Sequence, residues 1–110
     1  MKNSKITLDI YLNENNIPEK ISCISSEEKK DKIIKSFMLS LWDPTERETL
    51  KIDLWTNDML LDDIKIFIYQ SILSMKEVVK KSLDNNKISD KIENFALEIA
   101  KEMDILKNNK

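Results

Sequence analysis

The side chains most often used for catalysis are nearly all missing from this chain of 110 residues. It contains no histidine and no glycine, and Cys23 and Arg47 are its only cysteine and arginine. Histidine is the usual general base and metal ligand near neutral pH, and glycine lets a loop close tightly around a phosphate. Histidine-based catalytic triads, phosphate-binding loops and dinucleotide fingerprints are therefore excluded in their usual forms.

Carboxylates are the plentiful reactive groups that remain. They cluster in sequence at Asp43, Asp53, Asp58, Asp62 and Asp63. Paired acids can hydrolyse glycosides or hold Mg²⁺, but aspartate is also common in turns and in the first turn of a helix. We therefore expect no catalytic residue, no cofactor and no metal site, and a carboxylate- or Mg²⁺-dependent enzyme stays open as an alternative.

Charge and composition exclude further classes of partner. The net charge is −2, so no basic field is available to attract nucleic acid. No run of 18 apolar residues is present, so we expect no membrane span. No apolar segment typical of a signal peptide follows the first residues, and a lone cysteine fits a reducing compartment. We expect a cytoplasmic protein.

The first part of the chain predicts a β-hairpin followed by a short helix. Apolar residues alternate over residues 5–13 and again over 19–25, as in paired strands. Ser25 and Glu28 have the spacing of a helical capping box. We expect an antiparallel hairpin from these two segments and a short surface helix over 27–34.

The segment 36–43 fits either a strand or a helix, whereas 49–56 alternates clearly as a strand. Residues 43–48 are good turn material, which favours a second hairpin. In that hairpin we expect Leu39 to oppose Leu54 and Leu41 to oppose Ile52.

Two long helices are predicted in the C-terminal half. Apolar residues recur every three or four positions from Leu61 to Val79 and again from Ile88 to Met103, with Ser89 as the expected N-cap. The predicted fold is therefore α+β, a single domain over residues 1–110. An antiparallel sheet of about four strands, formed by the two hairpins, would pack on the two helices, with the short helix between the hairpins.

The two tryptophans are the most promising functional residues. In the expected second hairpin they share the face that does not carry the leucines, since side chains alternate along a strand. Tryptophan is enriched at binding hot spots. We call this set of residues the tryptophan surface and predict that it binds a protein partner, with packing inside the protein as the competing interpretation: Met38, Ser40, Trp42, Lys51, Asp53 and Trp55.

The same segment carries a family resemblance. The chain reads Leu-Trp-Asp at 41–43, Ile-Asp-Leu-Trp-Thr at 52–56 and Asp-Asp-x-Lys-x-Phe at 62–67, with Ile-Pro-Glu upstream at 17–19. With these blocks it resembles the gliding-motility protein GldC family of Bacteroidetes over nearly its whole length. The resemblance implies a small, soluble, non-enzymatic accessory protein in gliding motility or a related cell-envelope process, and it supplies no catalytic residues.

Self-association is the other function that the sequence suggests. Ile66, Tyr69 and Leu73 form a second apolar patch on the first long helix, beside its main apolar stripe. A helix with two such patches contacts more than one neighbour, so we expect that the protein could form a homo-oligomer and act as a structural protein.

Overall fold

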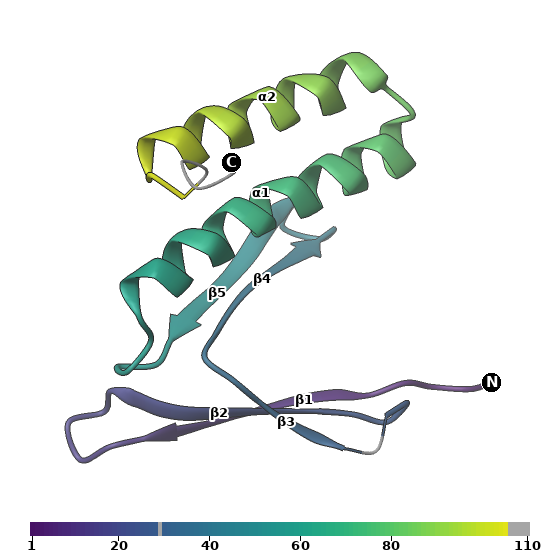
Figure 1. The fold of residues 1–110 in the computed structure, drawn as a ribbon. Coiled ribbons are helices and arrows are strands. Elements are labelled where there is room, and N and C mark those ends of the chain that lie inside the picture. Colours follow the sequence, from purple (N-terminus) through teal and green to yellow (C-terminus); the bar gives the residue numbers. More distant parts are fainter. Residues whose placement is uncertain (29, 106–110) are drawn as a thin grey trace. The chain divides into compact units, whose positions relative to one another are not determined.

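The computed structural model describes residues 1–28 and 30–105, and its elements form two compact units, residues 1–59 and 60–110. The first unit is built from five strands and the second from two helices (Figure 1). The strands are β1 (Ile6–Leu12), β2 (Pro18–Ser25), β3 (Asp31–Ile34), β4 (Ser36–Asp43) and β5 (Glu48–Trp55), and the helices are α1 (Leu61–Leu83) and α2 (Asn86–Glu102). The predicted α+β class is confirmed.

The predicted sheet is wrong in its strand count and its continuity. The five strands form two separate antiparallel sheets, one with the order β1-β2-β3 and one with β4 and β5. The extra strand is β3, which pairs with β2 where we expected a short helix. Ser25 does accept a hydrogen bond from the backbone N–H of Glu27 (3.2 Å), but this bond closes a turn between two strands. That a sheet packs on the two helices stays a prediction, as does a single domain.

The first hairpin follows its alternating sequence. Ile10 lies opposite Ile21 and Leu8 opposite Cys23, so apolar side chains meet across the β1–β2 pair. In the connecting turn, the Asn13 side chain accepts hydrogen bonds from the backbone N–H groups of Asn15 (2.8 Å) and Ile17 (3.1 Å). Ile21 and Ser22 of β2 are the buried centre of this hairpin.

The second hairpin settles the ambiguity of residues 36–43, which form strand β4. Its register differs from our expectation: Leu39 lies opposite Ile52 and Leu41 opposite Leu50. The hairpin closes two residues earlier on β5 than that register would require, at the Asp43–Glu48 pair, with Arg47 in a left-handed conformation (φ 55°). Because the register moved by an even number of residues, each side chain kept its predicted face.

The two helices form an antiparallel hairpin (Figure 1). Asp62 and Asp63 lie in the first turn of α1, and Lys80 and Lys81 in its last turn, where each charge favours the helix dipole. The N-cap of α2 is Asn85, whose side chain accepts the backbone N–H of Ile88 (3.1 Å). The predicted cap Ser89 is wrong: it is buried inside the helix, and its hydroxyl donates to the carbonyl of Asn86 (3.0 Å).

Lys76 of α1 and Glu93 of α2 form an ion pair (2.9 Å) that links the two helices. This contact, a hydrogen bond to the Glu93 carboxylate, raises the pKa of Lys76 above its ordinary value. In the described residues, neither helix is long and apolar enough to cross a bilayer.

Candidate functional site

The tryptophan surface is one face of the β4–β5 hairpin, and all of its members are exposed. Directly opposite residues of an antiparallel pair share a face, and the register pairs Met38 with Asp53 and Ser40 with Lys51. The structure therefore brings together the six residues that the sequence predicted. Trp42 retains 59% of its surface and Trp55 retains 60%, so both side chains are exposed. That this surface binds a protein stays a prediction.

The middle of this surface is polar and its ends are aromatic. The Lys51 ammonium contacts Asp53 Oδ1 (3.3 Å) and donates to the Ser40 hydroxyl (3.3 Å). Trp42 lies opposite Thr49 near the turn, whereas Trp55 lies opposite Ser36 at the open end of the hairpin. Six residues of strand separate the two positions, which is about 20 Å at the usual rise per residue. The two tryptophans of one chain therefore lie far apart on the same face.

The two tryptophans have different surroundings. At the turn, the Arg47 guanidinium lies 6.0 Å from the centre of the Trp42 ring, at the outer limit of a cation–π contact. At the open end, Trp55 lines a hollow of about 250 Å³ with Ile17, Pro18, Asp53, Leu54 and Asn57. This volume lies below the range of ordinary small-molecule sites.

A polar junction fixes the open end of the hairpin. Lys35, between β3 and β4, accepts a hydrogen bond from the backbone N–H of Thr56 (2.8 Å), and the N–H of Asn57 donates to the carbonyl of Pro18 (3.0 Å). These bonds hold the end of β5 against the start of β2. The hollow beside Trp55 therefore has a defined wall, which sequence patterns could not have revealed because its two sides are far apart in the chain.

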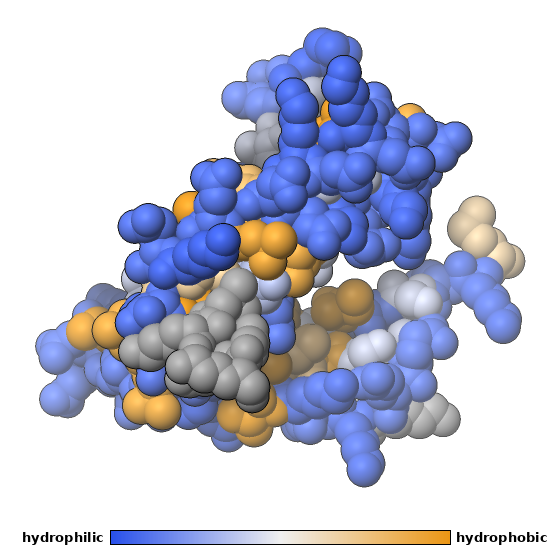
Figure 2. Space-filling view, turned by 45° about the horizontal axis from the view of Figure 1, so that its top comes forward, coloured by the Kyte–Doolittle hydropathy of each residue, from blue (hydrophilic) through white to orange (hydrophobic). Residues whose placement is uncertain are grey.

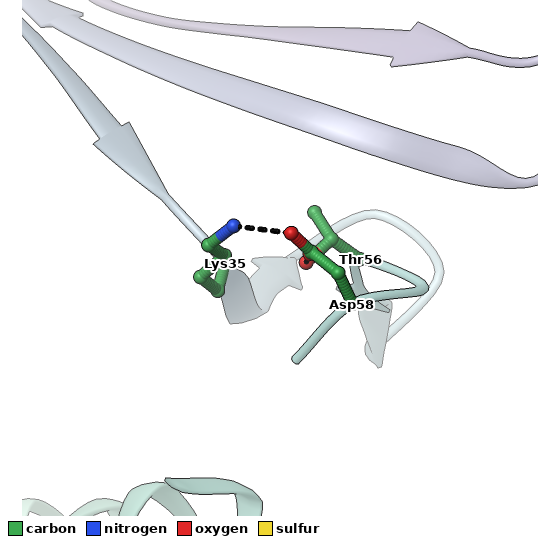
Figure 3. Close-up of polar contacts among 3 residues, drawn as sticks. All are labelled: Lys35, Thr56 and Asp58. Carbon is green, nitrogen blue, oxygen red and sulfur yellow. Dashed lines mark hydrogen bonds and ion pairs between the residues drawn. The ribbon is translucent and has the colours of Figure 1, made fainter. Parts of the chain in front are cut away.

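Side chains complete this junction (Figure 3). The Lys35 ammonium and Asp58 Oδ2 form an ion pair (2.7 Å), and the buried Thr56 hydroxyl donates to Asp58 Oδ1 (2.8 Å). These hydrogen bonds, first that from Lys35 and then that from Thr56, lower the pKa of the Asp58 carboxyl. No sequence pattern singles out Lys35, since a lysine at a bend has no distinguishing neighbours.

The carboxylates that could have supported an enzyme have structural partners. Asp53 is paired with Lys51, and Asp58 with Lys35. Asp43 accepts the backbone N–H of Thr45 (2.9 Å) within the β4–β5 turn. Over the described residues, no three carboxylate or cysteine side chains are grouped as metal ligands would be. Turn formation and ion pairing account for these three aspartates.

Apolar side chains are also exposed outside the tryptophan surface, and Figure 2 shows several of them (orange) among the hydrophilic residues (blue). The face of the hairpin opposite the tryptophans carries exposed Leu41, Leu50 and Ile52. On α1, Ile66 is exposed, while Tyr69 and Leu73 of the predicted helical patch are half-buried. Self-association through this helix stays a prediction.

Comparison with known proteins assigns the family. Residues 18–105 match the family described as gliding motility-associated protein GldC-like. The match spans both units and includes the hairpin, the junction and both helices. No curated protein and no solved structure matches the chain. Because the family match covers well over half of the chain, the protein belongs to the GldC-like family of gliding-motility-associated proteins.

Proposed function

We propose that this protein is a non-enzymatic accessory of gliding motility, or of a related cell-envelope process, that binds another protein through the tryptophan surface. The observation that carries the proposal is the exposure of both tryptophans on one face of a hairpin, since large aromatic side chains are costly to leave in water and are typical of binding hot spots. A cytoplasmic location is supported by the lone Cys23, which has no disulfide partner in the sequence.

The surface has the composition of a small protein interface. Its ends offer apolar anchors, Trp42 and Trp55 with Met38, and its centre offers the charged Lys51 and Asp53. A mixed surface of this kind binds by burying the aromatic rings while the charges fix the orientation of the partner. The hollow beside Trp55 would accept one side chain of that partner.

Paired affinity captures from cells that make this protein would identify the partner. The bait is compared with a Trp42→Ser/Trp55→Ser variant and with a Tyr11→Ser control, which removes an aromatic side chain of similar exposure from β1. Far-UV circular dichroism should be unchanged in both variants, because the substituted side chains are exposed. The expected partner is captured by the wild type and the control and is lost with the tryptophan variant.

The captured protein is then purified and titrated against the bait. Replacing either tryptophan with serine should weaken binding about 30-fold, which corresponds to a loss of about 2 kcal/mol of binding free energy. Trp42 and Trp55 are the only tryptophans, so Trp42→Phe and Trp55→Phe variants report by fluorescence which ring becomes buried. Unchanged affinity in the double serine variant would show that the tryptophan surface is not the interface.

A further inference from the structure

Strand β5 has an edge with no strand of the described residues paired to it, which ends just before Asn57, where the backbone N–H donates to the carbonyl of Pro18 (3.0 Å). β5 pairs with β4 on one side, and within the described residues no strand pairs with its other side. A two-stranded hairpin is of marginal stability by itself, and the unpaired backbone groups of an edge strand can accept a further strand. A strand from another molecule can therefore pair with this edge of β5 and extend the sheet.

The sequence of β5 has a self-complementary order. Residues at equal distances before and after Ile52 have side chains that can interact favourably with each other. The pairs are Lys51 with Asp53, Leu50 with Leu54, and Thr49 with Trp55. When two identical strands pair antiparallel about a two-fold axis, residues at equal distances from the axis lie opposite each other.

We propose that two copies of this protein pair through β5, antiparallel, about a two-fold axis at Ile52. Lys51 of each copy then lies opposite the partner's Asp53, and two ion pairs form across the dimer. On the other face, Leu50 lies opposite the partner's Leu54. The two hairpins become one four-stranded sheet with the order β4-β5-β5-β4.

Charge complementarity selects this partner and this register. The Lys51 and Asp53 side chains are 49% and 40% exposed, and each reaches along the face that carries the tryptophans. Moving the axis by one residue would place Lys51 against the partner's Lys51, or Asp53 against the partner's Asp53, and like charges directly opposite destabilise a sheet. Two copies of β4 could not form such ion pairs along their outer edges, because residues 36–42 include no charged side chain.

The pairing changes the tryptophan surface. Trp42 lies opposite Thr49 within one chain, and in the dimer Thr49 lies opposite the partner's Trp55. Trp42 is then two strand spacings, about 10 Å, from the partner's Trp55, compared with about 20 Å from Trp55 of its own chain. Two composite aromatic patches result. This consequence rests on the proposed binding function, whereas the pairing itself does not.

Disulfide cross-linking tests the pairing with no other protein present. In a Cys23→Ser background, Ile52→Cys places two thiols opposite each other on the axis, where Cα atoms are about 4.5–5.5 Å apart and a disulfide can form. Leu54→Cys is the matched control: it lies on the same face, but the partner's residue 54 is four positions away along the strand, about 13 Å. Mild oxidation should link the first variant and not the second. If the two cysteine variants formed disulfide-linked dimers equally, or if neither did, the proposal would be overturned.

A charge swap gives an independent measurement in solution. Lys51→Asp or Asp53→Lys alone would place like charges opposite each other at both positions and should weaken the dimer about tenfold, as measured by sedimentation. The double variant Lys51→Asp/Asp53→Lys restores opposite charges and should recover dimerisation, while Glu46→Lys in the turn should have no effect. A monomer near 12.9 kDa at all concentrations would overturn the pairing, while leaving partner capture by the tryptophan surface to succeed or fail separately.

Discussion

At the scale of single residues, the absence of glycine has a structural consequence. Among the residues that the structure describes, four backbone positions adopt positive φ, and all are occupied by residues with a Cβ: Asn16, Arg47, Asp84 and Asp104. Asparagine and aspartate tolerate this region better than other such residues, but glycine enters it with no steric cost. The chain therefore keeps some strain at its turns that a glycine would remove.

Asp84 offers the clearest test of this strain. It ends α1 with φ 50°, and it places a negative charge at the negative end of the helix dipole. We expect Asp84→Gly to raise the free energy of unfolding by about 1 kcal/mol, because it relieves both the backbone strain and the unfavourable charge. Thermal unfolding followed by circular dichroism measures the change. Asp84→Asn, which removes only the charge, should give a smaller gain, and a loss of stability in the glycine variant would contradict this explanation.

At the scale of elements, the Lys35–Asp58 ion pair connects the β3–β4 bend with the segment that follows β5. Because the pKa of Asp58 is lowered in the folded protein, its carboxylate stabilises the fold at pH values above the pKa of the unfolded chain, near 3.9. The stabilisation is lost as pH falls through the lower pKa of the folded state. The effect is small, since both side chains are at least half exposed.

We expect Asp58→Asn to lower the unfolding temperature slightly at pH 7. The difference from the wild type should shrink once pH falls below about 4 and disappear below the lowered pKa of Asp58 in the folded protein. Thermal unfolding at several pH values measures this. Lys35→Met should show the same pH dependence, and the double variant should cost less than the sum of the single variants, because both remove one interaction. A difference that persists unchanged into acid would show that the ion pair is not its cause.

At the scale of the whole molecule, very few side chains are completely buried. Among the described residues, the apolar ones with no exposed surface are Ile21 of β2 and the small Ala96 and Ala100 of α2. Large apolar side chains with much exposed surface occur in both units, from Ile6 and Trp42 to Leu61. The stability of a chain of this kind depends strongly on each of its few buried positions.

Ile21→Ala should therefore destabilise the strand unit by about 2–5 kcal/mol, through lost burial and an unfilled cavity. Urea unfolding followed by tryptophan fluorescence measures this, because both tryptophans lie in that unit. Ile6→Ala is the control: Ile6 is 72% exposed, and its loss should change stability by no more than about 0.5 kcal/mol. If the two substitutions lowered the free energy of unfolding equally, burial of Ile21 would not be a main source of the stability of the strand unit.

Sequence alone predicted the hairpin strands, the two long helices and the residues of the tryptophan surface. Apolar residues that alternate with period two indicate a strand, and those that recur every three or four positions indicate a helix. Both patterns are local properties of the sequence, so they can be recognised without knowledge of the tertiary packing. The face shared by Trp42 and Trp55 was predicted correctly even though the register was off by two residues, because an even shift keeps side chains on the same face. Membership of the GldC-like family was also readable from residues 37–67 and is confirmed by the match over 18–105.

Only the tertiary structure decided the register of the second hairpin, the strand β3 and the surroundings of Trp55. The register depends on Arg47 adopting a left-handed turn conformation, which is uncommon for arginine and so could not be predicted from the residue type. β3 forms because β2 offers it a hydrogen-bonding edge, and the hollow beside Trp55 exists because Asn57 bonds to Pro18. The β2–β3 pairing and the hollow join separate segments of the chain, and such pairings are selected by the free energy of the whole fold, which no local pattern contains.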